Sequence, residues 1–201
     1  MMDQTVQRRL IEAVANAVVN HADELTTLDQ AIGDGDHGLN MKRGALVILE
    51  RVDELGAQPL PAALKAAGQM LVMKVGGASG PLYGTLLMTL GKELPAAPDR
   101  DDLVRALGAA VAAVKKIGRS DVGQKTMLDV LGPVYEELTL GGPAPFDRIR
   151  QRGAAAADAT IPMKAIKGRA SFLGERSIGH MDPGARSASL MIAAACTVMK
   201  E

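Results

Sequence analysis

The sequence predicts an all-α protein in which seven or eight antiparallel helices form one bundle, and three observations support this prediction. Apolar residues recur every three or four positions, and no stretch alternates apolar and polar residues as a strand would. Aromatic residues make up only 2% of the chain, so the core must consist of aliphatic residues and methionine, which favours helices over a β-sandwich. The length of 201 residues fits a single domain, over residues 1–201, that can bury a full core.

The expected helices follow from the apolar spacing and from the proline and glycine residues that interrupt it. In chain order they span residues 3–28, 41–55, 62–75, 82–94, 101–117, 125–138, 146–163 and 183–200. The first is one long helix or a helix pair, with Val6, Leu10 and Val14 on one face. Pro59 and Pro61 end the second, because proline cannot continue a helix.

The later helices have further local signals. The helix over 101–117 has acids in its first turn and Lys115 and Lys116 in its last, as the helix dipole favours. The next is expected despite Pro133, and Pro183 can open the final helix at its first position. Residues 167–182 are expected to form a long loop.

Charge and cysteine content exclude several classes of protein. Twenty-three acidic residues balance 23 basic ones, so nothing suggests nucleic-acid binding or a membrane-binding patch. No apolar run approaches the roughly 18–20 residues of a membrane span, and the start of the chain does not resemble a signal peptide. The single cysteine, Cys196, excludes an internal disulfide and is compatible with a cytoplasmic protein, in which it would be a buried apolar residue.

An acidic, glycine-rich motif at residues 29–40 is the most informative stretch. Asp29, Asp34 and Asp36 lie within eight residues, and the intervening glycines allow the backbone to bring their carboxylates together. Converging carboxylates suit a hard divalent cation, Mg²⁺ or Ca²⁺, and the alternative is a solvated acidic loop. The dinucleotide-binding glycine pattern is rejected because no strand precedes it, and an EF-hand is rejected because Ala45 stands where its final glutamate belongs.

Glycines are concentrated in four clusters that bound long helices. They fall in 33–38, 76–84, 118–123 and 168–184, which suggests loops gathered around a ligand at one end of the bundle. Helix N-termini with glycine approaches are suited to phosphate, and Ser79 could add its hydroxyl. Each cluster could instead be simple loop punctuation, and the basic residues of 167–182 could be solvated.

Four motifs together resemble the nucleotide-binding L-subunit family of the dihydroxyacetone kinases. They occupy residues 32–41, 76–84, 123–127 and 168–185, cover nearly the whole chain and occur in the expected order. The resemblance implies an eight-helix antiparallel up-and-down barrel with the nucleotide at one end. Leu39 stands where many relatives are expected to have threonine, which removes a hydroxyl and leaves the backbone amide.

The resemblance also implies roles for particular residues. Asp29, Asp34 and Asp36 match the ligands of two Mg²⁺ ions that bridge the phosphates of ADP or ATP. The positions that match nucleotide contacts are His37, Gly38, Leu39, Asn40, Ala78, Ser79, Gly118, Met127, Arg169, Asp182, Pro183 and Gly184. No general acid or base is expected, because phosphoryl transfer depends mainly on positioning and charge neutralisation.

The function implied is that of a cytoplasmic kinase subunit that is complete only with its partner. It would pass the terminal phosphoryl group of Mg²⁺-bound nucleotide to dihydroxyacetone held on a separate K subunit. In the first version ADP stays bound, and a phosphocarrier M subunit of the phosphotransferase system rephosphorylates it in place.

Two alternatives remain open. The chain could be an ATP-dependent subunit that exchanges nucleotide and serves dihydroxyacetone or another small ketose such as erythrulose. It could also be a non-catalytic regulator of the same fold, although a regulator is expected to lack the three aspartates.

Overall fold

Helices account for all the regular secondary structure in residues 3–143 and 145–200, the part of the chain that the computed structural model describes. The elements are α1 (Gln4–Asn20), α2 (Ala22–Ile32), α3 (His37–Glu50), α4 (Val52–Ala57), α5 (Leu60–Lys74), α6 (Ser79–Glu93), α7 (Arg100–Gly118), α8 (Leu128–Leu140), α9 (Pro145–Asp158), the 3₁₀ helix η1 (Arg169–Ser177) and α10 (Pro183–Lys200). The all-α prediction is confirmed. No helix in the described residues is long and apolar enough to cross a membrane.

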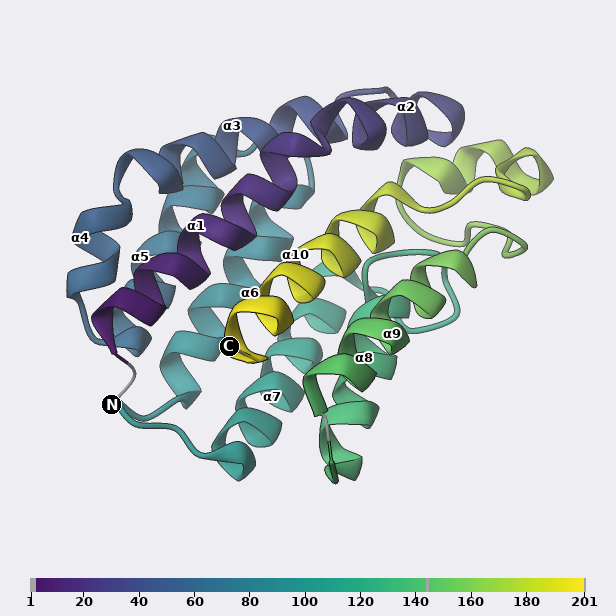
Figure 1. Ribbon diagram of the computed structural model, residues 1–201. Coiled ribbons are helices and arrows are strands. Elements are labelled where there is room, and N and C mark those ends of the chain that lie inside the picture. Colours follow the sequence, from purple (N-terminus) through teal and green to yellow (C-terminus); the bar gives the residue numbers. More distant parts are fainter. Residues whose placement is uncertain (1–2, 144, 201) are drawn as a thin grey trace.

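The long helices pack side by side in a closed ring (Figure 1). Each contacts the next in the order α1, α3, α5, α6, α7, α8, α9 and α10, and α10 returns to α1. Short α2 and α4 extend α1 and α3 beyond single non-helical residues, His21 and Arg51. The described chain therefore has ten α-helices rather than seven or eight. Ring neighbours run antiparallel, so α3, α6, α8 and α10 all begin at one end.

Several predicted boundaries are wrong for identifiable reasons. α2 continues to Ile32, so Asp29 lies on a helix rather than in a loop. α3 begins at His37 because the Asp29 carboxylate accepts hydrogen bonds from the amides of Asp36 and His37, which stabilises the start of the helix. The expected loop over 167–182 contains the helix η1. α8 begins only at Leu128, since the preceding residues form a turn.

Glycine permits the closest helix contact in the ring, between α5 and α6. A Cβ at Gly84 would lie 2.3 Å from a Val72 methyl carbon and 2.8 Å from the Gly68 carbonyl oxygen. A Cβ at Gly68 would meet the Gly84 carbonyl at the same 2.8 Å. Because each position faces the other's backbone, neither can accept a side chain without moving the helices apart.

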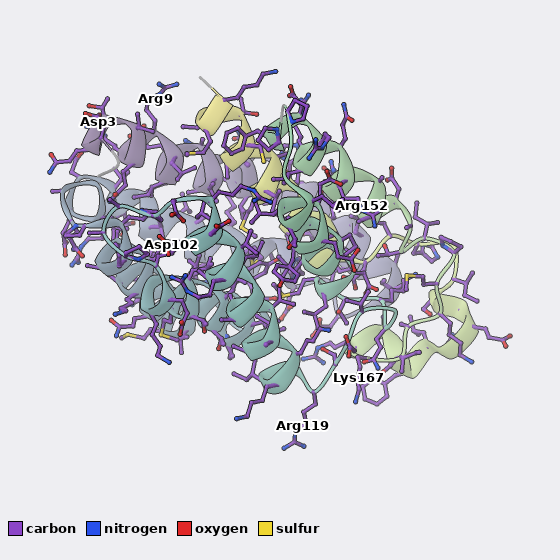
Figure 2. The ribbon with its side chains drawn as sticks, turned by 90° about the horizontal axis from the view of Figure 1, so that it is seen from below. Asp3, Arg9, Asp102, Arg119, Arg152 and Lys167 are labelled. Carbon is purple, nitrogen blue, oxygen red and sulfur yellow. The ribbon has the colours of Figure 1, made fainter. Side chains whose placement is uncertain are left out.

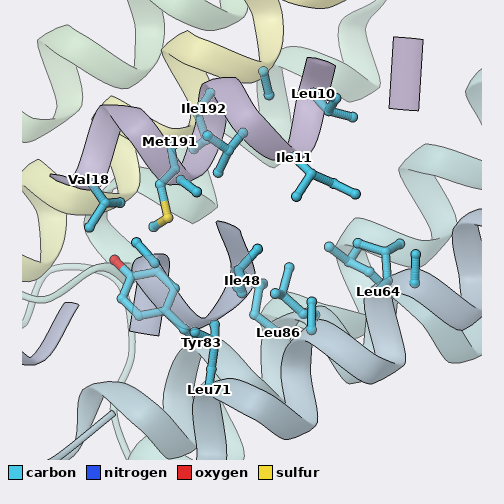
Figure 3. A pocket seen from close by; sticks show the side chains of 18 of the residues that line it. Leu10, Ile11, Val18, Ile48, Leu64, Leu71, Tyr83, Leu86, Met191 and Ile192 are labelled. Atoms are coloured by element: carbon cyan, nitrogen blue, oxygen red, sulfur yellow. The ribbon is translucent and has the colours of Figure 1, made fainter. Parts of the chain in front are cut away.

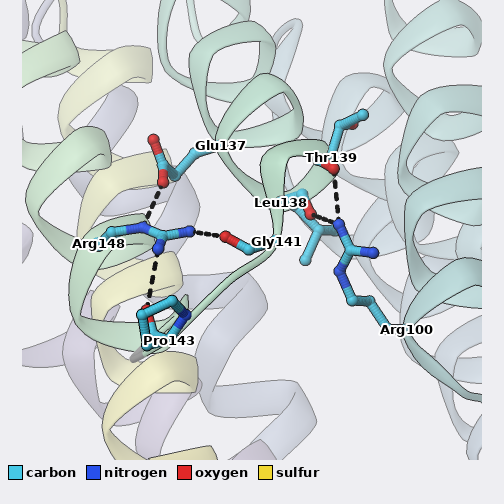
Figure 4. Close-up of polar contacts among 7 residues, drawn as sticks. All are labelled: Arg100, Glu137, Leu138, Thr139, Gly141, Pro143 and Arg148. Atoms are coloured by element: carbon cyan, nitrogen blue, oxygen red, sulfur yellow. Dashed lines mark hydrogen bonds and ion pairs between the residues drawn. The ribbon is translucent and has the colours of Figure 1, made fainter.

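Two arginines secure the end of the ring at which α8 ends (Figure 4). Arg148 donates to the Glu137 carboxylate at 2.7 Å and to the Pro143 and Gly141 carbonyls. Arg100 donates to the carbonyls of Leu138 and Thr139 at 2.9 and 2.6 Å. The Arg100 bonds satisfy carbonyls that the last turn of α8 leaves without helical partners, and the Arg148 bonds hold the turn that follows α8.

The ring encloses an apolar cavity of about 310 Å³ (Figure 3). Side chains from α1, α3, α5, α6, α8 and α10 line it, among them Ile11, Ile48, Leu86 and Met191. Tyr83 lines both this cavity and the pocket described below.

Replacement of Gly84 by alanine should destabilise the protein by about 1–3 kcal/mol, because the added methyl group overpacks α5 against α6. Gly153→Ala is the matched control. Its Cβ would have no neighbour closer than 3.6 Å, so alanine should be neutral or stabilise by up to about 1 kcal/mol through helix propensity. Urea unfolding of both variants checks this, and equal effects would contradict the proposed packing.

Candidate functional site

A pocket of about 160 Å³ opens at the end of the ring where α3, α6, α8 and α10 begin. His37, Ser79, Met127 and Pro183 lie at or beside the first residues of these four helices, and all four line the pocket. Helix N-termini present free backbone N–H groups and the positive end of the helix dipole. Four of them around one pocket make it a site for an anion such as phosphate.

Eleven of the fifteen residues predicted for the site line this pocket. They are Asp29, Asp34, Asp36, His37, Ala78, Ser79, Met127, Arg169, Asp182, Pro183 and Gly184. The structure brings them together from segments far apart in sequence. Their individual roles stay predictions.

The three aspartates form one cluster beside the helix N-termini. One carboxylate oxygen from each of Asp29, Asp34 and Asp36 lies within 4.8 Å of the others. Three converging carboxylate oxygens fit the preference of Mg²⁺ for hard oxygen ligands. Asp34 also pairs with Arg169, whose Nε lies 2.9 Å from its carboxylate, so the segment after α9 reaches the cluster.

Asp29 has a structural duty besides its place in the cluster. It is buried, and its Oδ2 accepts the Asp36 and His37 amides at 2.9 and 3.1 Å. Its Oδ1 lies where a Cβ at Gly33 would stand, only 2.1 Å from that position. Glycine at 33 therefore leaves room for the carboxylate, which a turn requirement alone would not have predicted.

His37 anchors a buried chain of hydroxyl groups. Its Nδ1 lies 3.0 Å from the Ser79 hydroxyl and its Nε2 lies 3.0 Å from that of Ser187. The Ser187 hydroxyl lies 2.7 Å from the hydroxyl of Tyr83, which also donates to the Gly184 carbonyl. Burial lowers the pKa of His37, which favours the neutral ring, and nearby Asp29 opposes that shift. These hydrogen-bonded side chains fix the first turns of α3, α6 and α10 relative to one another.

Asp182 is a second buried titratable group that lines the pocket. Its Oδ2 accepts the Ala185 amide at 2.7 Å, the bond expected of the residue that caps α10. Burial raises the pKa of Asp182 to about 7, and the charge of Asp129 adds to the increase while Lys125 opposes it. Burial likewise lowers the pKa of Lys125.

Four predicted contact residues do not line the pocket. Gly38 is buried where a Cβ would lie 2.0 Å from the Ala22 carbonyl oxygen, so it allows α2 and α3 to touch. Leu39 is 58% exposed on the outer side of α3. The Asn40 side chain is buried and accepts a bond from Arg43, and Gly118 ends α7.

Several residues that shape the pocket were missed by the sequence reasoning. Lys125 lines it and is almost fully buried, and Asp129 accepts the amides of Gly123 and Thr126 at 2.5 and 2.7 Å. Lys125 belongs to the motif at 123–127, so the motif indicated that this segment lies near the site. It did not indicate a role for the lysine. Ser187 has no signal in the sequence, because a serine inside a helix is not distinctive.

The ring and its pocket define a class of protein: an all-helical domain that presents a carboxylate cluster to several helix N-termini, as a cation-bound phosphate compound requires. Residues 31–197 match the DAK2 domain family, and the chain belongs to that family.

Relatives of similar length are kinase subunits. The chain is 44% identical over 173 residues to the ADP-binding subunit DhaL of PEP-dependent dihydroxyacetone kinase 1 from Listeria innocua, covering 83% of this chain and 82% of that protein. It is 40% identical over 185 residues to the corresponding Escherichia coli subunit, covering 88% of each.

Longer relatives contain a region similar to this chain. The chain is 32% identical to human triokinase/FMN cyclase over 198 residues, which cover 95% of this chain and 34% of that protein. The crystal structure of the C. freundii dihydroxyacetone kinase in complex with AMP-PNP and Mg²⁺ superposes with a TM-score of 0.79 at 26% identity, covering 98% of this chain and 34% of that one.

The raised pKa of Asp182 should make stability depend on pH. The folded protein holds the Asp182 proton up to about pH 7, whereas the unfolded chain loses it near the ordinary aspartate pKa of 3.8. Stability from this group is therefore present below the unfolded pKa and is lost as pH rises between these two values. Asp182→Asn, which keeps an acceptor for the Ala185 amide, should gain on wild type by up to about 1.4 kcal/mol per pH unit across that window.

Urea unfolding between pH 4 and pH 8, with EDTA present, measures this effect. The control is Asp158→Asn, at the exposed end of α9, which should follow the wild-type profile. Parallel profiles for Asp182→Asn and wild type would show that burial does not perturb this carboxyl group.

Proposed function

We propose that this chain is the nucleotide-binding subunit of a cytoplasmic dihydroxyacetone kinase. It passes the terminal phosphoryl group of a Mg²⁺-bound nucleotide to dihydroxyacetone carried by a separate K subunit. The observation that carries the proposal is the cluster of Asp29, Asp34 and Asp36, with ligand oxygens within 4.8 Å, facing four helix N-termini in one pocket. Residues 1–201 act as a single domain in this proposal.

Each part of the pocket has one task. Asp29, Asp34 and Asp36 would hold two Mg²⁺ ions, which would neutralise phosphate charge when bound. The N–H groups at the starts of α3, α6 and α10 that are not already donated to Asp29 or Asp182 would bind phosphate oxygens. His37, uncharged because it is buried, orients the Ser79 hydroxyl toward them. Met127 lines the side of the pocket that would receive the base.

The proposed donor is a phosphocarrier M subunit that rephosphorylates bound ADP. Its support is that relatives covered over more than four-fifths of their length are ADP-binding subunits of PEP-dependent kinases. D-erythrulose kinase, 35% identical, supports the alternative of a kinase for another small ketose, but the chain spans about a third of that protein. The three aspartates argue against a non-catalytic regulator.

The proposed docking face for the K subunit surrounds the pocket mouth. Phe172 on η1 is 89% exposed, and the apolar side chains of Leu39, Met73 and Ile178 are also exposed on segments at this end. Figure 2 shows Arg119 and Lys167 at the same side of the molecule, away from Asp3 and Asp102. Exposed aromatic residues are frequent anchors of protein interfaces.

Asp34→Asn should fold normally and lose nucleotide that depends on Mg²⁺, because one cluster ligand loses its charge while Asp29, which supports α3, stays intact. The nucleotide content of freshly purified, desalted protein, with and without EDTA, measures this. Asp53→Asn, a surface residue paired with Arg8, is the charge-matched control and should behave as wild type.

Nucleotide content of the wild-type protein separates the phosphocarrier-fed kinase from the ATP-dependent alternative. Stoichiometric ADP released only by EDTA supports the phosphocarrier-fed kinase, whereas an empty protein that binds ATP–Mg²⁺ reversibly supports the ATP-dependent alternative. A wild-type protein that binds neither nucleotide rejects both. Wild-type retention and transfer by Asp34→Asn would reject the metal assignment.

Phe172→Ala should raise the KM for the K subunit by about tenfold or more and leave nucleotide content unchanged, because it removes an interface anchor beside the pocket. Leu140→Ala is the control, since Leu140 is also exposed but ends α8 at the opposite end. Steady-state transfer assays with varied K subunit test this. Equal KM values for the two variants would place the docking face elsewhere.

A further inference from the structure

Lys125 is the most unusual buried residue in the described chain. It is 1% exposed and has the largest side chain among the fully buried residues. Lysine is rarely buried, because its ammonium group loses strong hydration, and burial requires compensating hydrogen bonds. Of the lysines in residues 3–143 and 145–200, Lys125 alone is buried.

Its partners are four backbone carbonyls from one segment. The ammonium nitrogen lies 2.6 Å from the oxygen of His180, 2.7 Å from that of Ser177, 3.0 Å from that of Met163 and 3.5 Å from that of Ile161. An ammonium group has three N–H donors, so the three shorter contacts account for them. All four carbonyls lie between the end of α9 and the start of α10.

The position of these carbonyls along the segment is informative. Ile161 and Met163 precede the stretch 167–170 that lines the pocket, and Ser177 and His180 follow it. One ammonium group therefore joins the two ends of a loop whose middle carries Arg169. The capping residue Asp182 and the start of α10 come directly after its last acceptor.

The turn that carries Lys125 is itself fixed. Lys125 has a φ of +62°, a left-handed conformation that disfavours side chains and suits glycine. Asp129 secures the turn through the amides of Gly123 and Thr126, and Gln124 accepts the Ile166 amide at 3.2 Å. A side chain held at a backbone position better suited to glycine indicates that the ammonium group has a specific task.

We propose that Lys125 is a positioning residue: its ammonium group clamps residues 161–180 and thereby sets Arg169 and the Asp182–Gly184 turn against the nucleotide pocket. The inference rests on the proposed nucleotide-binding function for its effect on affinity. The clamp itself is a property of the free protein. The three aspartates lie outside the clamped segment, on α2 and just before α3, and Asp34 meets that segment through its ion pair with Arg169.

Lys125→Met keeps the aliphatic chain and removes the ammonium group. Amide hydrogen exchange in residues 161–180 of the nucleotide-free protein should rise by about tenfold or more, and exchange in α1 and α5 should not change. The dissociation constant for ADP–Mg²⁺ should rise by a similar factor. Binding of Mn²⁺ alone to the aspartate cluster should change by less than about twofold, because the three ligand residues lie outside the clamped segment and the Asp34–Arg169 ion pair is exposed to solvent.

Lys164→Met is the matched control. Lys164 belongs to the same segment and carries the same charge, but its side chain is exposed, so all three measurements should match wild type. Wild-type exchange in 161–180, or wild-type ADP affinity, in Lys125→Met would overturn the proposal. The proposal would also be overturned if Lys125→Met weakened Mn²⁺ binding and accelerated amide exchange equally throughout the chain. That result would show that Lys125 stabilises the whole protein and not one segment.

A measurement on wild type covers the case in which Lys125→Met does not fold. With ¹⁵N-labelled lysine, one ammonium signal should exchange slowly with water and shift when ADP–Mg²⁺ is added. If every lysine ammonium exchanges as fast as a solvated one, the clamp does not exist. Failure of wild type to bind ADP–Mg²⁺ would reject the proposed function. The exchange data on the nucleotide-free protein would still show whether the Lys125 ammonium group holds residues 161–180.

Discussion

The antiparallel order of the helix ring is the constraint on which the rest of the structure depends. Because ring neighbours alternate in direction, every second N-terminus falls at one end, and α3, α6, α8 and α10 all begin around one pocket. Their dipoles make that end electropositive at close range without requiring a basic surface. A chain with zero net charge can therefore hold a polyphosphate.

The antiparallel ring also places negative charge beside these positive helix N-termini. α2 ends where these helices begin, and its last turn carries Asp29, whose carboxylate stabilises the start of α3 and joins Asp34 and Asp36. Carboxylates packed beside helix N-termini are favourable even before a cation is considered, and their clustering favours a divalent one. One residue thus links the stability of the α2–α3 junction to the composition of the site, and Gly33 provides the space for it.

Much of the fold and of the site could be predicted from the sequence. Apolar spacing located the long helices, and glycine clusters correctly indicated that the loops gather at one end. The motifs identified eleven pocket-lining residues, because each motif is local and distinctive. Helix boundaries were less accurate: residues 37–40 proved helical, since the Asp29 carboxylate supplies from α2 the acceptor that a local pattern could not reveal. The structural tasks of Gly38 and Asn40 depend on the packing of other helices, so the motif could not separate them from pocket-lining residues.

The sequence by itself determined the all-helical class, the positions of the breaks and the acidic motif, because these depend on residues close together in the chain. Only the tertiary structure decided how distant segments meet: that Lys125 binds carbonyls up to 55 residues away, and that His37 reaches Ser187 across 150 residues. Burial also raises the pKa of Asp182 and lowers that of His37, because desolvation disfavours the charged form of each group. Local sequence governs backbone preference, whereas burial and long-range hydrogen bonds exist only after the helices have closed into the ring.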